Sequence, residues 1–174
     1  EKYEFCKWGP LFKKVVWRTI TIFTIGLFLN AFPFIRQDWD WSHFRIMGVL
    51  QRIALAYFFA STIVVRTDIK GIVKISTGIL IGYWLLLMGH GWITDVDPYA
   101  LETNLQLVID SIIIGKDHLY GGTGIQFDPE GLLSTLPSVV TVLIGFLVGT
   151  MIKTAKDHED NAQRMAVLGA LLII

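Results

Sequence analysis

The chain has little cysteine, no net charge and no local metal motif. Its 174 residues include a single cysteine, Cys6, so no internal disulfide can form. The 15 basic and 15 acidic residues cancel, and we therefore expect no nucleic-acid partner. The four histidines are far apart in the sequence and no Cys/His cluster has zinc spacing, so we expect no metal site. Internal repeats, low-complexity segments, an initiating methionine and a signal peptide are also missing.

Apolar residues, in contrast, are abundant, at 53% of the chain with a mean hydropathy of +0.55. Runs such as IALAYFFASTIVV have no polar face, although helices of soluble proteins have one. Each complete run approaches the roughly 20 residues that a spanning helix needs. We therefore predict an all-α, polytopic membrane protein, whose single domain (1–174) is truncated at both ends. Its five predicted spans are about 11–34, 44–65, 72–93, 132–152 and, incomplete, 165–174.

The distribution of basic residues predicts the orientation in the membrane. Eleven of the 15 fall on one side: Lys2, Lys7, Lys13, Lys14, Arg18, Arg66, Lys70, Lys74, Lys153, Lys156 and Arg164. The positive-inside rule places this side in the cytoplasm, so the long 94–131 connection is extracytoplasmic. The other side holds the remaining four basic residues and an aromatic belt: Arg36, Arg45, Arg52, Lys116, Trp39, Trp41, Trp92 and Tyr99. Within 94–131, NLQLVIDSIIIG predicts an interfacial or re-entrant helix that is too short to span.

Two glycine pairs have GxxxG spacing, Gly78 with Gly82 and Gly145 with Gly149. This spacing lets helix backbones approach closely in lipid. Packing within one subunit and a homodimer interface both agree with it.

The sequence Asp128-Pro129-Glu130-Gly131 stands at the mouth of the fourth apolar run. It has the features of a helix start, with Asp128 as N-cap, Pro129 at the first helical position and Glu130 near the positive end of the dipole. A functional interpretation is the alternative, because Pro137 should bend the helix, and bent membrane helices are tolerated where they line a cavity. We predict that Asp128 mainly caps the helix and contributes to substrate binding. Glu130 is predicted to face an extracytoplasmic cavity as a catalytic carboxylate.

The segment FRIMGVLQRIALAYF places Arg45, Gly48 and Arg52 at i, i+3 and i+7, on one predicted helical face. A charged residue inside a span usually faces the bundle interior or a wet cavity, although an ion pair that only positions helices is the alternative for Arg52. Because the guanidinium group binds phosphate and carboxylate bidentately, both arginines are predicted to bind substrate and an anionic cofactor.

Two amides and two histidines complete the predicted site. Gln51 and Asn30 lie at a similar outer depth and are predicted to bind substrate. His118 is a predicted catalytic base and His90 a second candidate, the alternative for each being an interfacial residue.

Two segments carry a resemblance to a known family. NAFPF…WDWSHFRIMGVLQRIALAYF and DHLYGG…FDPEGLLSTLPSVVTVLIGFLVG resemble the transmembrane acyltransferases related to heparan-α-glucosaminide N-acetyltransferase, including bacterial homologues. The match extends from about Trp17 to Gly149. The resemblance implies a longer protein of the bacterial inner membrane that moves an acetyl group from cytosolic acetyl-CoA to an amino sugar or glycan on the far side.

The same resemblance implies CoA phosphates as partners of Arg45 and Arg52. It also places the family's catalytic histidine before the matching part, so that none of the histidines here can take that role, and the fragment alone is expected to be inactive. The alternative function is an amino-sugar transporter, because some bacterial relatives are described as such. Transporters commonly show an inverted repeat, and its absence favours the enzyme.

Overall fold

The computed structural model describes residues 8–32, 41–122, 124–154 and 158–171. Every regular element within these ranges is helical, which confirms the all-α prediction. Five residues of the topology prediction lie outside them: Lys2, Lys7, Arg36, Trp39 and Lys156.

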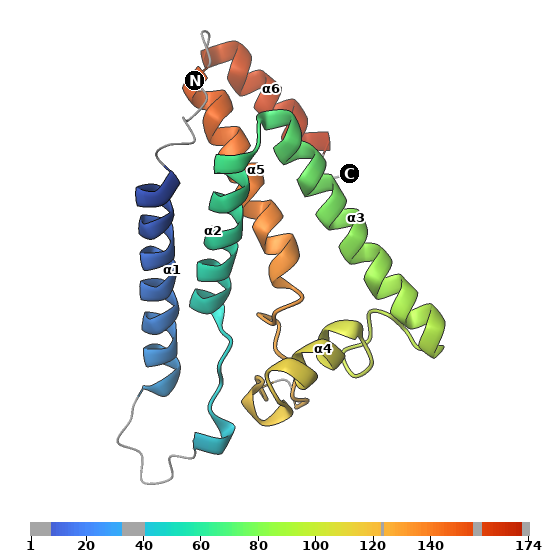
Figure 1. Cartoon of the computed structure of the whole chain (residues 1–174). Coiled ribbons are helices and arrows are strands. Elements are labelled where there is room, and N and C mark those ends of the chain that lie inside the picture. The colour runs from blue at the N-terminus through green and yellow to red at the C-terminus, as the bar shows by residue number, and fades with distance from the viewer. Residues whose placement is uncertain (1–7, 33–40, 123, 155–157, 172–174) are drawn as a thin grey trace.

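Four long helices form the body of the molecule (Figure 1): α1 Trp8–Ala31, α2 Val49–Arg66, α3 Ile69–Thr94 and α5 Thr135–Thr154. Helix α2 packs on both α1 and α5, and α3 packs on α5. A tight turn joins α2 to α3, where Asp68 caps α3 by accepting a hydrogen bond from the Gly71 N–H at 2.9 Å. Helix α6 His158–Leu171 contacts α5 near the same end of the molecule.

Helices α2, α3 and α5 are long and apolar enough to cross a membrane, and the chain is an integral membrane protein. Helix α1 has 24 residues but carries Lys13, Lys14 and Arg18 in its first half. Helix α6 has 14 residues, too few for a span. The predicted count of about five spans is therefore too high for the described residues, of which three helices qualify.

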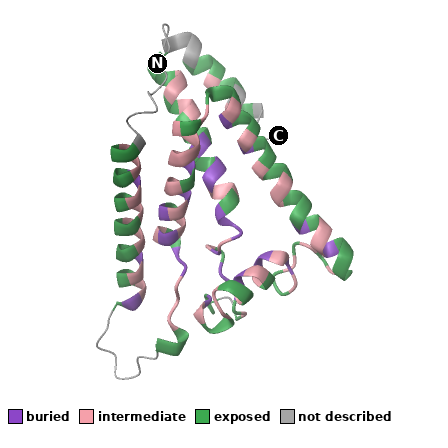
Figure 2. Cartoon of the chain, in the orientation of Figure 1, coloured by how far each residue is buried: buried purple, intermediate pink, exposed green. Residues whose placement is uncertain are grey.

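The buried core is small and lies where α2, α3 and α5 meet. Its members are Ala56, Ala60, Ile72, Val139 and Leu143. The two alanines let α2 approach its neighbours closely. Figure 2 shows buried residues concentrated on α2, the start of α5 and the chain before it, while α3 and the outer face of α1 are largely exposed. Exposed apolar side chains on these faces agree with contact to lipid.

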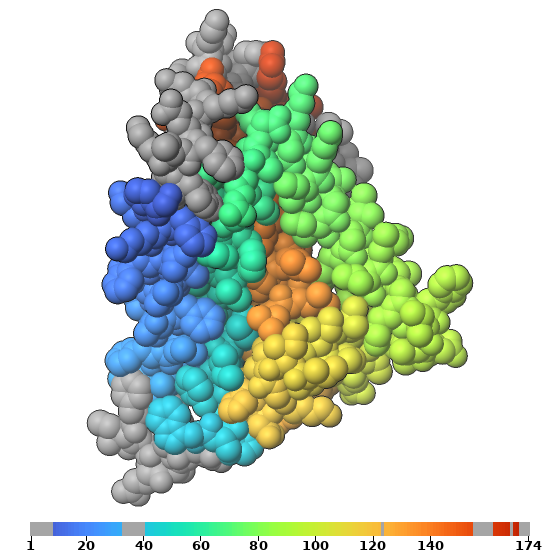
Figure 3. Space-filling model, in the orientation of Figure 1, coloured from blue at the N-terminus to red at the C-terminus, as the bar shows by residue number. Residues whose placement is uncertain are grey.

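The 94–131 connection folds back under one end of the long helices. It contains α4 Leu105–Ile113, which is the short helix predicted there, and the 3-10 turn η3 Lys116–His118. A second 3-10 turn, η2 Trp41–His43, contacts η3. In the space-filling view (Figure 3), this connection lies against residues 41–48 and the start of α5. Segments far apart in the sequence therefore meet at this end.

Local packing differs from the sequence interpretation at the glycines and at Pro137. Beside the four GxxxG glycines, the space that a Cβ would occupy is open within the described residues. Helix α5 begins at Thr135 rather than at the Asp128 motif, so Pro137 lies in its first turn. The missing N–H of proline leaves no helical hydrogen bond unmade in a first turn, so proline does not itself require a bend at this position.

Candidate functional site

Arg45 joins two acidic residues that lie more than 80 positions later in the chain. Its Nε donates to Asp128 Oδ2 at 2.9 Å and its Nη2 to Asp128 Oδ1 at 2.7 Å. The same Nη2 donates to Glu130 Oε2 at 2.6 Å. The hydrogen bond with Asp128 raises the pKa of Arg45 most, burial opposes this, and Glu130 adds to the increase. One guanidinium thus holds both carboxylates of the motif through charge-assisted hydrogen bonds.

The backbone around Arg45 is extended, not helical. Gly48 precedes α2, so the predicted helical face of Arg45, Gly48 and Arg52 is wrong. Asn30 Nδ2 donates to Arg45 O at 3.2 Å, and the Ile46 N–H donates to His118 O at 3.3 Å. These partners replace the hydrogen bonds of a helix and direct Arg45 toward the acidic turn.

His118 forms a second link to this extended segment. Its Nδ1 lies 2.7 Å from the carbonyl oxygen of Phe44. Because a carbonyl oxygen only accepts, Nδ1 carries the proton, and the lone pair of the neutral ring is on Nε2. His118 therefore holds the residue before Arg45 and keeps one basic nitrogen. His90, the second candidate, lies on α3 with a buried Nδ1 that has no hydrogen-bond partner among the described residues.

The aromatic ring of Tyr120 lies against Arg45, whose guanidinium carbon is 4.6 Å from the ring centroid. This distance is within the range of a cation–π contact. The Tyr120 carbonyl accepts from the Phe127 N–H at 2.9 Å, which folds the glycine-rich loop back on itself. The loop therefore contributes an aromatic wall to the cluster.

The acidic motif forms a turn ahead of α5. Asp128 Oδ1 accepts from the Glu130 N–H at 3.0 Å and Asp128 O from the Gly131 N–H at 3.1 Å. Asp128 does accept backbone hydrogen bonds, but within this turn, and it does not cap the helix. Its side chain is 0% exposed while that of Glu130 is 20% exposed. Glu130 is thus the carboxylate that a ligand can reach.

Arg52 extends from α2 toward the same turn. Its Nε donates to Ser138 Oγ at 2.5 Å and its Nη1 to Pro129 O at 3.4 Å. Among the described residues, no carboxylate forms an ion pair with it. The structure therefore brings a cation without an acidic partner beside the Arg45–Asp128–Glu130 cluster.

The two predicted amides occupy different surroundings. Gln51 is 0% exposed at the contact between α1 and α2, and neither polar atom of its amide has a partner among the described residues. A Cβ on Gly26 of α1 would lie only 2.7 Å from its Oε1. Asn30 supports the Arg45 carbonyl. Both residues contact elements next to the cluster and have no hydrogen bond to its carboxylates among the described residues.

Two residues of α4 that the sequence analysis does not single out also reach the turn. Gln106 Nε2 donates to Asp128 O at 2.8 Å, and Asp110 Oδ1 accepts from the Leu132 N–H at 2.9 Å. Burial raises the pKa of Asp110 to about 6, opposed by the backbone hydrogen bonds of Leu132 and Leu133 and assisted by the charge of Asp128. The i, i+4 spacing of these two polar residues on an otherwise apolar helix could have indicated in the sequence that they share a buried face. No sequence pattern indicated the contacts of Tyr120 and Ser138.

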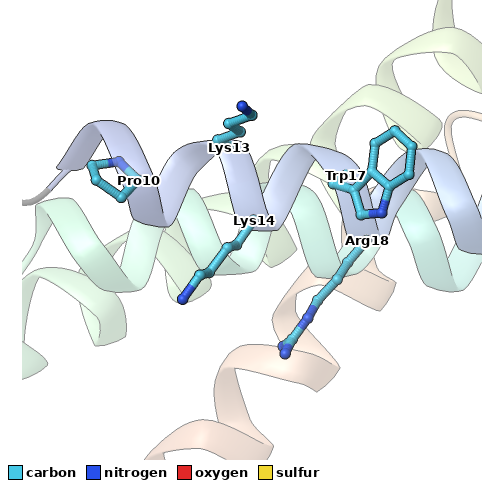
Figure 4. Close-up of a pocket in the computed structure, with 5 residues that line it drawn as sticks. All are labelled: Pro10, Lys13, Lys14, Trp17 and Arg18. Carbon is cyan, nitrogen blue, oxygen red and sulfur yellow. The ribbon is translucent and has the colours of Figure 1, made fainter.

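A pocket of about 370 Å³ lies elsewhere, along the first half of α1 (Figure 4). Pro10, Lys13, Lys14, Trp17 and Arg18 line it. Lys14 and Arg18 point the same way from the helix, and Lys13 and Trp17 point another. Figure 1 places this part of α1 far from the turn before α5. It is therefore separate from the Arg45 cluster.

Comparison with known proteins agrees with the motifs. No family model matches the chain. Heparan-alpha-glucosaminide N-acetyltransferase of Homo sapiens is 25% identical over 90% of this chain and 30% of its own length. The Mus musculus protein of the same name is 25% identical over 97% of this chain and 33% of its own length. The chain thus spans about a third of the length of the curated relatives it matches, and it is related in sequence to the heparan-alpha-glucosaminide N-acetyltransferases.

Proposed function

We propose that this protein is a membrane acetyltransferase that moves an acetyl group from cytosolic acetyl-CoA to the amine of an amino sugar or glycan on the extracytoplasmic side. The supporting observation is the Arg45–Asp128–Glu130 cluster, in a chain related to N-acetyltransferases. The distribution of basic residues supports the side of the membrane, and the resemblance to bacterial homologues supports a bacterial inner membrane. A homodimer stays a prediction.

Glu130 is the proposed general base. Acetyl transfer to an amine forms a C–N bond, breaks the C–S bond of the thioester so that CoA leaves as its thiolate, and releases one proton from nitrogen. A carboxylate within hydrogen-bond reach of the amine accepts that proton. Glu130 is 20% exposed and is held by Arg45 at 2.6 Å, so it is both accessible and oriented. His118, through Nε2, is the second proposed base.

Arg52 is the proposed anion-binding residue. Its hydrogen-bond partners, Ser138 Oγ and Pro129 O, are neutral, which leaves its positive charge available. An anionic group of a bound substrate has the complementary charge, and the planar guanidinium binds carboxylate or phosphate bidentately. Arg45 is already occupied by two carboxylates, so its proposed contribution is to hold Glu130.

The test uses the full-length protein in sealed vesicles, with labelled acetyl-CoA on the side of the Lys70 loop and glucosamine on the opposite side. We expect acetylated glucosamine to form only in this arrangement. Glu130→Gln should lower the rate on the order of 100-fold, because it removes the base while keeping the size of the side chain. Glu102→Gln is the matched control, since Glu102 is an exposed carboxylate of the same connection.

Accumulation of unmodified glucosamine without consumption of acetyl-CoA would contradict the enzyme and favour the transporter. Full activity of Glu130→Gln, with acetylation otherwise intact, would contradict only the role of Glu130.

A further inference from the structure

Helix α4 has a buried polar face that is unusual for so short and apolar an element. Gln106 and Asp110 lie one turn apart, and they are 8% and 1% exposed. The same helix leaves Ile112 and Ile113 largely exposed, at 77% and 65%. If α4 served only to bury apolar surface, leucine or isoleucine would occupy the inner positions, since buried polar groups are costly unless they are hydrogen-bonded.

Both inner side chains contact the backbone of the turn that carries Glu130. Gln106 reaches the carbonyl of Asp128, two residues before Glu130, and Asp110 reaches the N–H of Leu132, two residues after it. The turn precedes α5 and makes a backbone hydrogen bond of its own, from the Gly131 N–H to Asp128 O. The contacts of Gln106 and Asp110 add a partner from α4 on each side of Glu130.

Gly131 allows this close approach. A Cβ at Gly131 would overlap the Asp110 carboxyl group, with Oδ2 as the nearest atom. That oxygen is buried and has no hydrogen-bond partner among the described residues. The carboxyl group of Asp110 and the missing side chain of Gly131 are thus complementary in shape, which explains the glycine without any need for a special backbone angle.

We propose that Gln106 and Asp110 are positioning residues, which hold the turn from the α4 side so that Arg45 can hold the Glu130 carboxylate from the other. This inference rests on the proposed function for its kinetic consequence. The contacts of Gln106 and Asp110 with the turn, and the close approach of Asp110 to Gly131, belong to the fold. These α4–turn contacts can be tested without a substrate.

The test is a double-mutant cycle in the full-length protein, with Asp110→Ala, Gly131→Ala and the double variant. Gly131→Ala alone should displace the turn, and a displacement of about 1 Å lowers turnover on the order of 100-fold. In the double variant the added methyl group occupies the space left by the carboxyl group. Relative to Asp110→Ala, Gly131→Ala should then cause at most half of the loss, on a logarithmic scale, that it causes in the wild type. Equal effects of Gly131→Ala in both backgrounds would overturn the proposal.

Conservative substitutions separate positioning from mere folding. Asp110→Asn keeps an oxygen that accepts from Leu132, so we expect it to restore most of the kcat lost in Asp110→Ala, with the acceptor KM unchanged throughout. Ile112→Ala, on the exposed face of the same helix, is the control and should match the wild type. A uniform loss in Asp110→Asn and Asp110→Ala would overturn a hydrogen-bonding role.

Hydrogen exchange provides the readout that needs no activity. The amide of Leu132 should exchange on the order of tenfold faster in Asp110→Ala than in the wild type, while Asp110→Asn keeps it protected. Gln106→Leu should leave that amide protected and weaken protection at Glu130 and Gly131. If Leu132 exchanges equally in all variants, the α4–turn contacts do not hold the turn and the proposal is wrong. If exchange follows this pattern but no acetylation is found, the proposed function is wrong, while the role of the α4–turn contacts is supported.

Discussion

At the scale of single residues, Arg45 makes the burial of Asp128 tolerable. A fully buried carboxylate is stable only with a partner of opposite charge and satisfied hydrogen bonds. Arg45 supplies both with two parallel N–H donors, a geometry that lysine cannot reproduce. The charge of Asp128 is therefore used within the fold, whereas Glu130 keeps an exposed edge for a ligand.

Asp128→Asn tests this division of roles. The helix-cap interpretation predicts a mild effect, but the structure predicts a loss of about 1–3 kcal/mol in unfolding free energy, because Arg45 loses its bidentate partner. Melting curves in one detergent, with Asp117→Asn on the exposed part of the same connection as control, measure it. Identical melting of Asp128→Asn and the wild type would restore the cap interpretation.

Arg52→Lys should impair activity while folding and expression stay nearly intact. Lysine keeps the charge but cannot donate to Ser138 and bind an anion with one planar group. We expect a loss on the order of tenfold in kcat/KM, because this is the size of the effect of losing one hydrogen bond to a charged group. The loss should be larger for Arg52→Met, which also removes the charge. Full activity of both variants would make Arg52 a packing residue.

Asp110 should make stability depend on pH. Its pKa is raised to about 6 in the folded protein, against roughly 4 for an unperturbed aspartate. The folded state therefore binds its proton more tightly, so this contribution is fully present below pH 4 and is lost as pH rises through 6.

The expected loss in unfolding free energy is on the order of 2 kcal/mol. Asp128 and Tyr83 are the other titratable groups that interact electrostatically with Asp110. Subtracting the unfolding free energies of Asp110→Asn from those of the wild type between pH 4.5 and 7 isolates it. A difference that does not change with pH would contradict the prediction.

At the scale of secondary-structure elements, the contact between α1 and α2 depends on a glycine outside any GxxxG pair. Gly26 faces the buried amide of Gln51, whereas Gly78 on α3 faces open space within the described residues. Small residues promote close helix approach only where a partner lies opposite them. Spacing in the sequence cannot identify that partner.

Gly26→Ala should therefore destabilise the protein by about 1–2 kcal/mol, because the fully buried Gln51 has little room to move. Gly78→Ala should be neutral or stabilising by up to about 1 kcal/mol, since alanine is the better helix former. Unfolding of both variants in the same detergent gives the comparison. A larger loss for Gly78→Ala would indicate that a partner covers α3.

At the scale of the whole molecule, the long helices separate two ends. The predicted cytoplasmic basic residues that the structure describes lie near one end, and the Arg45–Asp128–Glu130 cluster lies at the other. Lys70 lies in the first turn of α3, next to the α2–α3 turn, and the 94–131 connection lies at the opposite end of α3. The positive-inside rule predicts that the first lies in the cytoplasm and the second outside.

Single cysteines at Lys70 and Gly121, in a cysteine-free background, should react with an impermeant maleimide from opposite faces of the membrane. Gly121 suits the experiment because a side chain there meets open space, whereas one at Gly122 would overlap the Tyr120 hydroxyl group. Labelling of both positions from the same face would contradict the predicted topology.

The sequence by itself determined the class of the fold. Uninterrupted apolar runs favour membrane-spanning helices over a soluble bundle. The lengths of the runs predict helices close to those observed, as for α3, which is predicted over 72–93 and found at Ile69–Thr94. The sequence also identified Arg45, Asp128 and Glu130 as the polar residues at one end. Hydropathy is a local property, so a local analysis recovers it.

Only the tertiary structure decided how these residues are used. Local rules start a helix at Asp128 and extend α2 back to Arg45, because capping and periodicity consider only neighbours in the chain. Both segments are instead non-helical, since the ion pair between Arg45 and Asp128 and the contacts of Gln106 and Asp110 satisfy their polar groups. Those partners are between 22 and 83 residues apart, and only folding brings them together.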